Sequence, residues 1–257
     1  MLAMSAAELH HTFAGPQHAG VVVLSNSLGT TLEMWEPQAG PLARDHRVLR
    51  YDLRGHGRSP VPATPYAMAD LGADLIALLD RKGIERASLC GVSLGGMVSM
   101  WVAAHAPERV DRLVLCSTSA IMGPPESWTD RAALVRREGV AAVADAVVAR
   151  WFTPAFAAAR PDVVARIRGQ LAATPAEGYA GCCEAIREMD QRPDLPAIGA
   201  PTLVIAAEGD PSTPPAHART IAGLIPGARL EVLDRGAHLV NVEAPDIVTP
   251  LVAAHLA

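Results

Sequence analysis

A Gly-x-Ser-x-Gly pattern at Gly91, Ser93 and Gly95 is the feature of this chain most able to do chemistry. A short apolar run precedes the pattern and a helix-compatible stretch follows it. That order is typical of a nucleophile elbow, in which a strand turns sharply into a helix and exposes a serine. A plain glycine-rich turn also fits the five residues alone, but the flanking elements favour an elbow with Ser93 as the nucleophile.

A histidine and a carboxylate must assist such a serine. The histidine takes the hydroxyl proton and the carboxylate orients the histidine. In hydrolases with an elbow the three residues follow in the order serine, acid, histidine. Asp210 follows an apolar run at 202–206, and His238 follows another at 230–233. We therefore predict that Ser93, Asp210 and His238 meet at one edge of a sheet.

Other residues compete for these two supporting roles. Glu208 shares the loop of Asp210, but Asp210 is followed by a Pro-Ser-Thr-Pro turn that would hold its carboxylate in place. His56 precedes Ser93, which is the wrong order for the base. The remaining histidines do not follow a predicted strand in the required way.

The negative oxygen formed during acyl transfer needs N–H donors that are already in position. The backbone N–H of Leu94, directly after the nucleophile, supplies one donor. The loop at 25–30 follows the first apolar run and supplies the second, for which we favour the N–H of Leu28. Ser27 is a candidate for an additional side-chain contact.

Alternating strands and helices must position these residues. Such alternation predicts an α/β fold with a mostly parallel central sheet flanked by helices, which binds ligands beyond the carboxyl ends of its strands. The predicted strands are 21–24, 47–51, 87–90, 112–116, 202–206 and 230–233, and the predicted helices between them are 68–82, 96–106, 216–224 and 245–256.

The alternation is interrupted between the fourth and fifth of these strands. Apolar residues recur there at helical spacing, and prolines separate the helical segments. We predict a helical cap at 122–195, inserted into a hydrolase core formed by 1–121 and 196–257. A separate helical domain is less consistent with the pattern, because the strands on either side need one another.

The overall composition excludes several functions. A net charge of −5 with 19% charged residues does not indicate a nucleic-acid surface. No apolar run reaches the roughly 18–20 residues of a membrane span, and the first residues do not resemble a secretion signal. The four cysteines have no CxxC spacing, and no metal-ligand cluster is recognisable. We expect a cytoplasmic protein without metal, nucleic-acid or membrane partners, and the sequence leaves its oligomeric state open.

Several longer segments resemble the α/β-hydrolase superfamily. The stretch Tyr51-Asp52-Leu53-Arg54-Gly55-His56-Gly57-Arg58-Ser59 is similar to its strand-to-loop signature, which is usually structural. Four further segments resemble 3-oxoadipate enol-lactonases in particular, and they lie at 25–30, 90–97, 150–154 and 179–187. The glycine of the acid loop, Gly209, stands later than in many relatives.

The resemblance implies an α/β-hydrolase fold and hydrolysis of 3-oxoadipate enol-lactone in aromatic breakdown by the β-ketoadipate pathway. Position by position it implies Ser93 as nucleophile, Asp210 as acid and His238 as base, with no cofactor. The substrate of that family is a small lactone bearing a carboxylate, which needs a partner once it is desolvated. The candidate substrate-binding residues are Arg137, Arg150, Arg187, Trp151 and Ser27.

Two other functions stay open at this point. One is a general carboxylesterase or a cofactor-free, haloperoxidase-like perhydrolase of the same fold. The other is a non-catalytic ligand receptor built on a hydrolase fold, because a fold does not determine a function. The presence of Ser93, Asp210 and His238 together disfavours the receptor.

Overall fold

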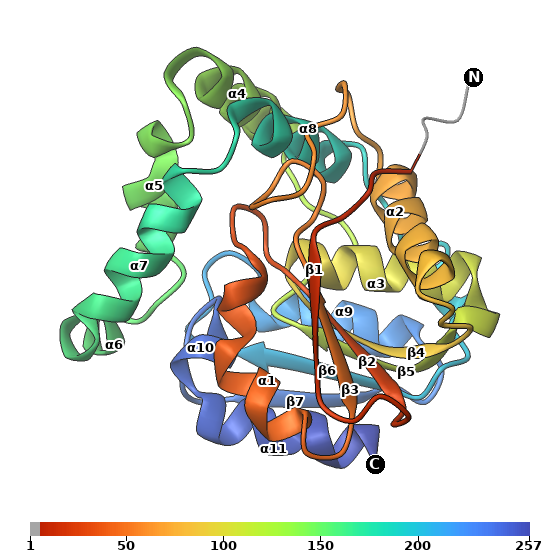
Figure 1. Cartoon of the computed structure of the whole chain (residues 1–257). Helices are drawn as coiled ribbons and strands as arrows, with labels where there is room; N and C mark the ends of the chain where they lie inside the picture. Colours follow the sequence, from red (N-terminus) through yellow and green to blue (C-terminus); the bar gives the residue numbers. More distant parts are fainter. Residues whose placement is uncertain (1–5) are drawn as a thin grey trace.

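The computed structural model describes residues 6–257 and contains a central sheet with helices on both faces (Figure 1). Within these residues the sheet has seven strands in the order β1-β3-β2-β4-β5-β6-β7. Only β1 and β3 pair antiparallel, so the predicted mostly parallel sheet is confirmed. The strands are β1 (His11–Ala14), β2 (Val21–Ser25), β3 (Arg47–Tyr51), β4 (Ala87–Val92), β5 (Val110–Cys116), β6 (Thr202–Ala207) and β7 (Arg229–Leu233).

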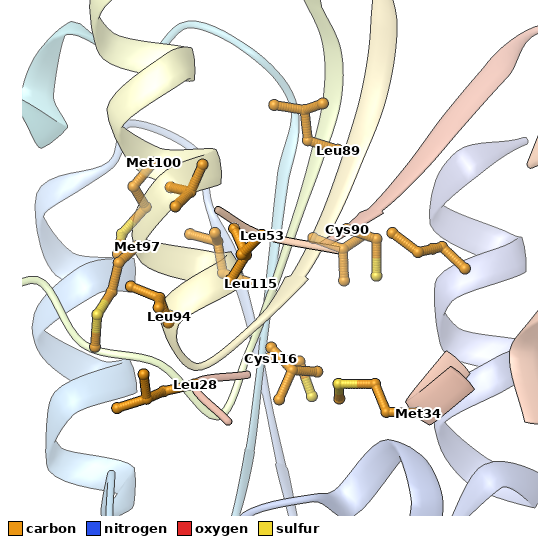
Figure 2. Packing of buried hydrophobic residues seen from close by; sticks show 14 of the residues in the cluster. Leu28, Met34, Leu53, Leu89, Cys90, Leu94, Met97, Met100, Leu115 and Cys116 are labelled. Atoms are coloured by element: carbon orange, nitrogen blue, oxygen red, sulfur yellow. The ribbon is translucent and has the colours of Figure 1, made fainter. Parts of the chain in front are cut away.

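The central strands are buried on both faces, which explains their continuous apolar runs. Every residue of β4 and β6 is buried. Figure 2 shows Cys116 beside Met34, with Cys90 further along the strands, and Met97 and Met100 of the helix at Leu94–His105 on the other side. Both cysteines are free thiols, and burial raises their pKa, so they behave as small apolar core residues.

Helices cover both faces of the sheet, as the alternating pattern predicts (Figure 1). Helix α2 buries Leu71, Leu75 and Leu78 at helical spacing, and α3 begins directly after Ser93. The helices that flank the sheet are α1 (Glu36–Leu42), α2 (Met68–Arg81), α3 (Leu94–His105), α9 (Pro215–Leu224), α10 (Val240–Glu243) and α11 (Pro245–Leu256). Short 3-10 turns lie at Leu32–Trp35, Pro107–Arg109 and Leu195–Ala197.

A group of helices fills the interval between β5 and β6, where the sequence predicts a cap. Figure 1 shows them in green to blue-green at one end of the sheet, and we call this group the cap. Val163, Ile167 and Leu171 are the buried residues of helix α7, and they have the helical spacing that the sequence displays. The helices of this group are α4 (Pro125–Glu138), α5 (Ala141–Val148), α6 (Pro154–Ala159), α7 (Pro161–Ala172) and α8 (Ala176–Arg187).

The cap contacts the core backbone to backbone at Gly55 and Gly178. A Cβ atom placed on Gly178 would lie 2.2 Å from the carbonyl oxygen of Gly55, and one on Gly55 would lie 2.3 Å from the Cα of Gly178. Neither position therefore accepts a side chain without a shift of the main chain. Gly55 also has a φ of 72°, a conformation that glycine adopts at little cost.

No helix within residues 6–257 has both the length and the apolar character that crossing a membrane requires.

Candidate active site

The serine of the Gly-x-Ser-x-Gly pattern lies in a sharp turn between β4 and α3. Ser93 has φ 55° and ψ −118°, a backbone conformation that costs free energy for a residue with a side chain. The two glycines make the turn possible, because a Cβ on Gly91 would lie 2.3 Å from the backbone of Gly95, and one on Gly95 would lie 2.1 Å from the carbonyl oxygen of Ser25. The geometry is that of a nucleophile elbow.

The structure joins Asp210 and His238, as expected for two loops that follow the neighbouring strands β6 and β7. Their Oδ2 and Nδ1 atoms are 2.9 Å apart. The turn after Asp210 also holds the carboxylate, since Oδ1 accepts from the backbone N–H groups of Ser212 and Thr213 at 2.8 and 3.0 Å. The hydroxyl of Thr213 donates to Oδ2 at 2.6 Å. This arrangement leaves Nε2 of His238 free to act as a base.

The buried carboxylate of Asp210 stays ionised near neutral pH. Burial alone would raise its pKa, but the charge of His238 and hydrogen bonds from His238 and Thr213 outweigh burial and lower the pKa to about 2. An ionised Asp210 selects the tautomer in which His238 Nδ1 carries the proton.

Ser93 and His238 line one cavity of about 220 Å³ between the core and the cap. Within residues 6–257 the hydroxyl of Ser93 makes no hydrogen bond, either to Nε2 of His238 or to another group. Hydrogen bonds between catalytic groups are often long without substrate and tighten when substrate binds. The other residues that line the cavity are Ser27, Leu28, Met97, Met122, Gly123, Ser127, Trp128, Arg131, Val147, Arg150, Trp151, Tyr179, Ile186, Pro211, Ser212 and Thr213.

The two expected oxyanion donors lie at the ends of neighbouring strands. Leu28 follows β2 and Leu94 follows β4, and these strands pair in parallel up to Ser25 and Gly91. Neither N–H donates to another protein group in the described part of the chain. The carbonyl of Ser27, which shares a peptide plane with the N–H of Leu28, accepts from the N–H and the hydroxyl of Thr30 at 3.1 and 2.7 Å. The loop geometry is therefore fixed before substrate arrives.

Three of the five predicted substrate-binding residues reach the cavity, namely Ser27, Arg150 and Trp151. The structure does not bring Arg137 or Arg187 there. The side chain of Arg137 is 64% exposed and pairs with Glu138. Arg187 pairs with Glu188 instead.

Arg131 lines the cavity beside Arg150, although the sequence reasoning did not select it. Its guanidinium lies over the ring of Trp128, 4.8 Å from the centroid. Burial, and then the positive charge of Arg131, lowers the pKa of Arg150. The Nε atom of Arg150 is buried without a hydrogen-bond partner, and neither arginine pairs with a carboxylate anywhere in residues 6–257. This side of the cavity can therefore accept an anion.

The loop of His238 is also attached to the cap. The carboxylate of Glu243 accepts from the N–H of Thr153 at 3.0 Å and from the N–H of Ala237 at 3.2 Å. The N–H of Leu239 donates to the carbonyl of Trp151 at 3.0 Å. Leu239, which follows His238, is thus bonded directly to the cap, and Ala237, which precedes it, is linked to the cap through Glu243.

Within the described residues no group of three or more histidine, cysteine or acidic side chains is arranged to hold a metal ion.

A serine in an elbow, a carboxylate and a histidine at the strand ends of such a sheet are the arrangement expected of a hydrolase. The sequence model described as the alpha/beta hydrolase fold matches residues 20–245, and the chain belongs to that family. Comparison with known proteins further identifies it as a carboxylic ester hydrolase.

Relatives of this chain include proteins that are named as enol-lactonases. The chain is 41% identical to 3-oxoadipate enol-lactonase 2 of Acinetobacter baylyi over 96% of this chain and 92% of that protein. It superposes with a TM-score of 0.95 on the crystal structure of the enol-lactonase from Burkholderia xenovorans LB400, at 45% identity, covering 97% of this chain and 96% of that one. A putative carbamate hydrolase of Variovorax paradoxus is 33% identical over 91% of this chain and 90% of its own length.

Proposed function

We propose that this protein hydrolyses 3-oxoadipate enol-lactone to 3-oxoadipate, a step of aromatic breakdown, through an acyl-enzyme on Ser93. The observation that carries the proposal is a single small cavity that combines Ser93 and His238 with two cationic side chains, Arg131 and Arg150. A lactone that bears a carboxylate matches both parts of this cavity, because the ring would meet Ser93 and His238 and the carboxylate would meet the two arginines. The enol-lactonase names of the relatives support the same substrate.

In the first half of the proposed reaction His238 Nε2 takes the proton of Ser93 while the serine oxygen attacks the lactone carbonyl. The carbonyl oxygen becomes an oxyanion that accepts from the N–H groups of Leu28 and Leu94. Collapse of this intermediate breaks the ring C–O bond and expels an enolate, which takes the proton from His238 and becomes the ketone. An enolate leaves more easily than an alkoxide, so ring opening has a low barrier.

In the second half water attacks the acyl-enzyme, in which the whole opened chain is still joined to Ser93 by an ester bond. His238 takes a proton from the water, whose oxygen attacks the ester carbonyl of Ser93. The same two N–H groups hold the second oxyanion. Its collapse breaks the bond to the serine oxygen, which recovers its proton from His238, and 3-oxoadipate is released.

Arg131 and Arg150 would hold the carboxylate of the substrate. Both are cationic, and the unpartnered Nε–H of Arg150 is a donor that a carboxylate oxygen would satisfy. An anion between them would also reduce the repulsion of two neighbouring positive charges. Trp151 and Trp128 would supply apolar walls around the ring.

The test is hydrolysis of freshly generated enol-lactone compared with hydrolysis of an uncharged aryl acetate. We expect Ser93→Ala to lose both activities. Arg131→Met with Arg150→Met should lower kcat/KM for the lactone roughly 100-fold and leave the aryl acetate much less affected, because only the lactone carries a carboxylate. Arg137→Met with Arg187→Met is the matched control, since these arginines lie outside the cavity.

The outcomes separate the alternatives. Equal losses for the two substrates in the Arg131 and Arg150 variant would indicate a general esterase. Wild-type turnover by Ser93→Ala would exclude the acyl-enzyme. The relative named as a putative carbamate hydrolase makes a carbamate the second substrate class to test, and faster cleavage of a carbamate than of the lactone would overturn the proposed substrate.

A further inference from the structure

His56 is a fully buried histidine between the strand β3 and the cap, outside the triad. Its Nδ1 lies 3.0 Å from the carbonyl oxygen of Arg54, and its Nε2 lies 2.9 Å from the backbone nitrogen of Gly29. The side chain thus connects its own loop to the loop that carries Leu28. Its exposed fraction is 0%, so water does not compete for either contact.

These two partners fix the protonation of the ring. A carbonyl can only accept, so Nδ1 carries the proton and donates to Arg54. A backbone N–H can only donate, so Nε2 carries no proton and accepts from Gly29. Burial lowers the pKa of His56, which agrees with a neutral ring. A neutral histidine is required here, because an imidazolium would face the N–H of Gly29 with a second donor.

The contact acts on the peptide group next to the expected oxyanion donor. The carbonyl of Ser27, in the peptide that contains the N–H of Leu28, is held by Thr30. The N–H of Gly29 belongs to the following peptide, and His56 holds that one. Gly29 has a φ of 79°, and a glycine can adopt many other backbone conformations at little cost. The residue itself therefore does not fix the loop at this point. Thr30 therefore holds the peptide of the Leu28 N–H itself, and His56 holds the peptide that follows it, so the two contacts together set the direction of this N–H.

We propose that His56 is a positioning residue, which aims the Leu28 N–H at the oxyanion through its hydrogen bond with Gly29. The inference rests on the acyl-enzyme mechanism proposed above, though not on the identity of the lactone. It also gives the cap an influence on the reaction, because Gly55, the neighbour of His56, touches Gly178 of the cap directly.

Two substitutions separate the contacts of the ring. In His56→Gln the side-chain oxygen can take the place of Nε2 and accept from Gly29, while the bond to Arg54 is lost. In His56→Asn the amide N–H can replace Nδ1 and donate to Arg54, while the acceptor for Gly29 is lost. The positioning role predicts that Gln preserves turnover and that Asn does not.

The substrate for this test is an aryl acetate, which does not depend on recognition of a carboxylate. We expect kcat of His56→Asn to fall about 10- to 100-fold with little change in KM, because a misdirected donor weakens only the transition state. His56→Gln should stay close to wild type. Thermal unfolding of both variants shows whether they fold equally well.

Binding of two inhibitors provides a second measurement. An aryl trifluoromethyl ketone forms a hemiketal with the serine and places an oxyanion at the two donors, whereas the matching methyl ketone binds without one. The affinity of His56→Asn for the fluoroketone should fall by a factor similar to its loss of kcat, and its affinity for the methyl ketone should not change. A purely structural role would lower both affinities together.

The inference is overturned if His56→Asn keeps wild-type kcat and fluoroketone affinity. It is also overturned if Gln and Asn lose activity equally and both unfold at lower temperature. Failure of the proposed mechanism would look different: Ser93→Ala would then hydrolyse the aryl acetate at the wild-type rate, whatever the His56 variants do.

Discussion

Thr153 of the cap and Glu243 of the core form a direct polar connection beside the histidine of the active site. The N–H of Thr153 donates to Glu243 at 3.0 Å, and its hydroxyl donates to the other carboxylate oxygen. The same carboxylate accepts from Ala237, the residue before His238. The cap therefore contributes to the placement of the loop of His238 as well as to the walls of the cavity.

Loss of this connection should loosen the loop of His238. We expect Thr153→Val to reduce the free energy of unfolding by about 1–2 kcal/mol, because the carboxylate loses a donor in a partly buried place. Its kcat should fall several-fold while Thr153→Ser, which keeps the hydroxyl, remains near wild type. Urea unfolding and aryl acetate kinetics measure the two effects. Identical behaviour of Val and Ser would contradict this role.

Removing the charge of Asp210 should affect catalysis far more than binding. Asp210→Asn leaves the acceptor for Ser212 and Thr213 in place but no longer selects the correct tautomer of His238. We expect kcat to fall about 10³- to 10⁴-fold with a small change in KM. Glu208→Gln is the control from the same loop, and a comparable loss there would assign the acid role to Glu208.

The same carboxylate should make stability depend on pH in acid. Its folded pKa is about 2, whereas an unfolded Asp titrates at about 3.9. The unfolded state thus binds a proton first as the pH falls. The contribution, about 2–3 kcal/mol, is complete above pH of about 4 and is lost as the pH falls towards about 2.

Urea unfolding of wild type and Asp210→Asn at neutral and acid pH measures this contribution. The difference in unfolding free energy between the two proteins should shrink as the pH falls through that window, because the variant has no carboxylate to titrate at this position. If the difference in unfolding free energy stays constant from neutral to acid pH, the ionised carboxylate of Asp210 does not contribute to stability in this way.

The elbow should not accept a methyl group. Gly95→Ala would press a Cβ against the backbone of Ser25, and we expect a loss of several kcal/mol or failure to fold. Gly169→Ala is a suitable comparison, since no atom lies within 4 Å of a Cβ there. That exposed position is inside a helix, where alanine should stabilise by up to about 1 kcal/mol. Thermal unfolding distinguishes the two.

Local signals were sufficient to predict most of the sheet and to place Ser93, Asp210 and His238 directly after strands. Ser93 and Asp210 follow the fully buried strands β4 and β6, and His238 follows the shorter apolar run of β7, so strand ends and chain order pointed to these three residues. The strand β1 (His11–Ala14) was missed, because it is a short edge strand of four partly buried residues without a clear alternation. Its existence depends on pairing with β3.

Which arginines of the cap reach the cavity could not be predicted from the sequence. Arg131 and Arg137 lie on the same helix, α4. Six residues turn an α-helix by about 240°, so the two side chains leave it in different directions. Which direction meets the cavity depends on how α4 packs against α8, and neither helix carries a local signal for that. The roles of Glu243 and His56 likewise depend on contacts with segments far away in the chain.

The main chains of Gly55 and Gly178 are in contact, so no side chain separates the core from the cap at that point. A side chain at either position would therefore push the cap away from the core. A chimaera that combines this core with the cap of another hydrolase will seat correctly only if its junction residues are equally small.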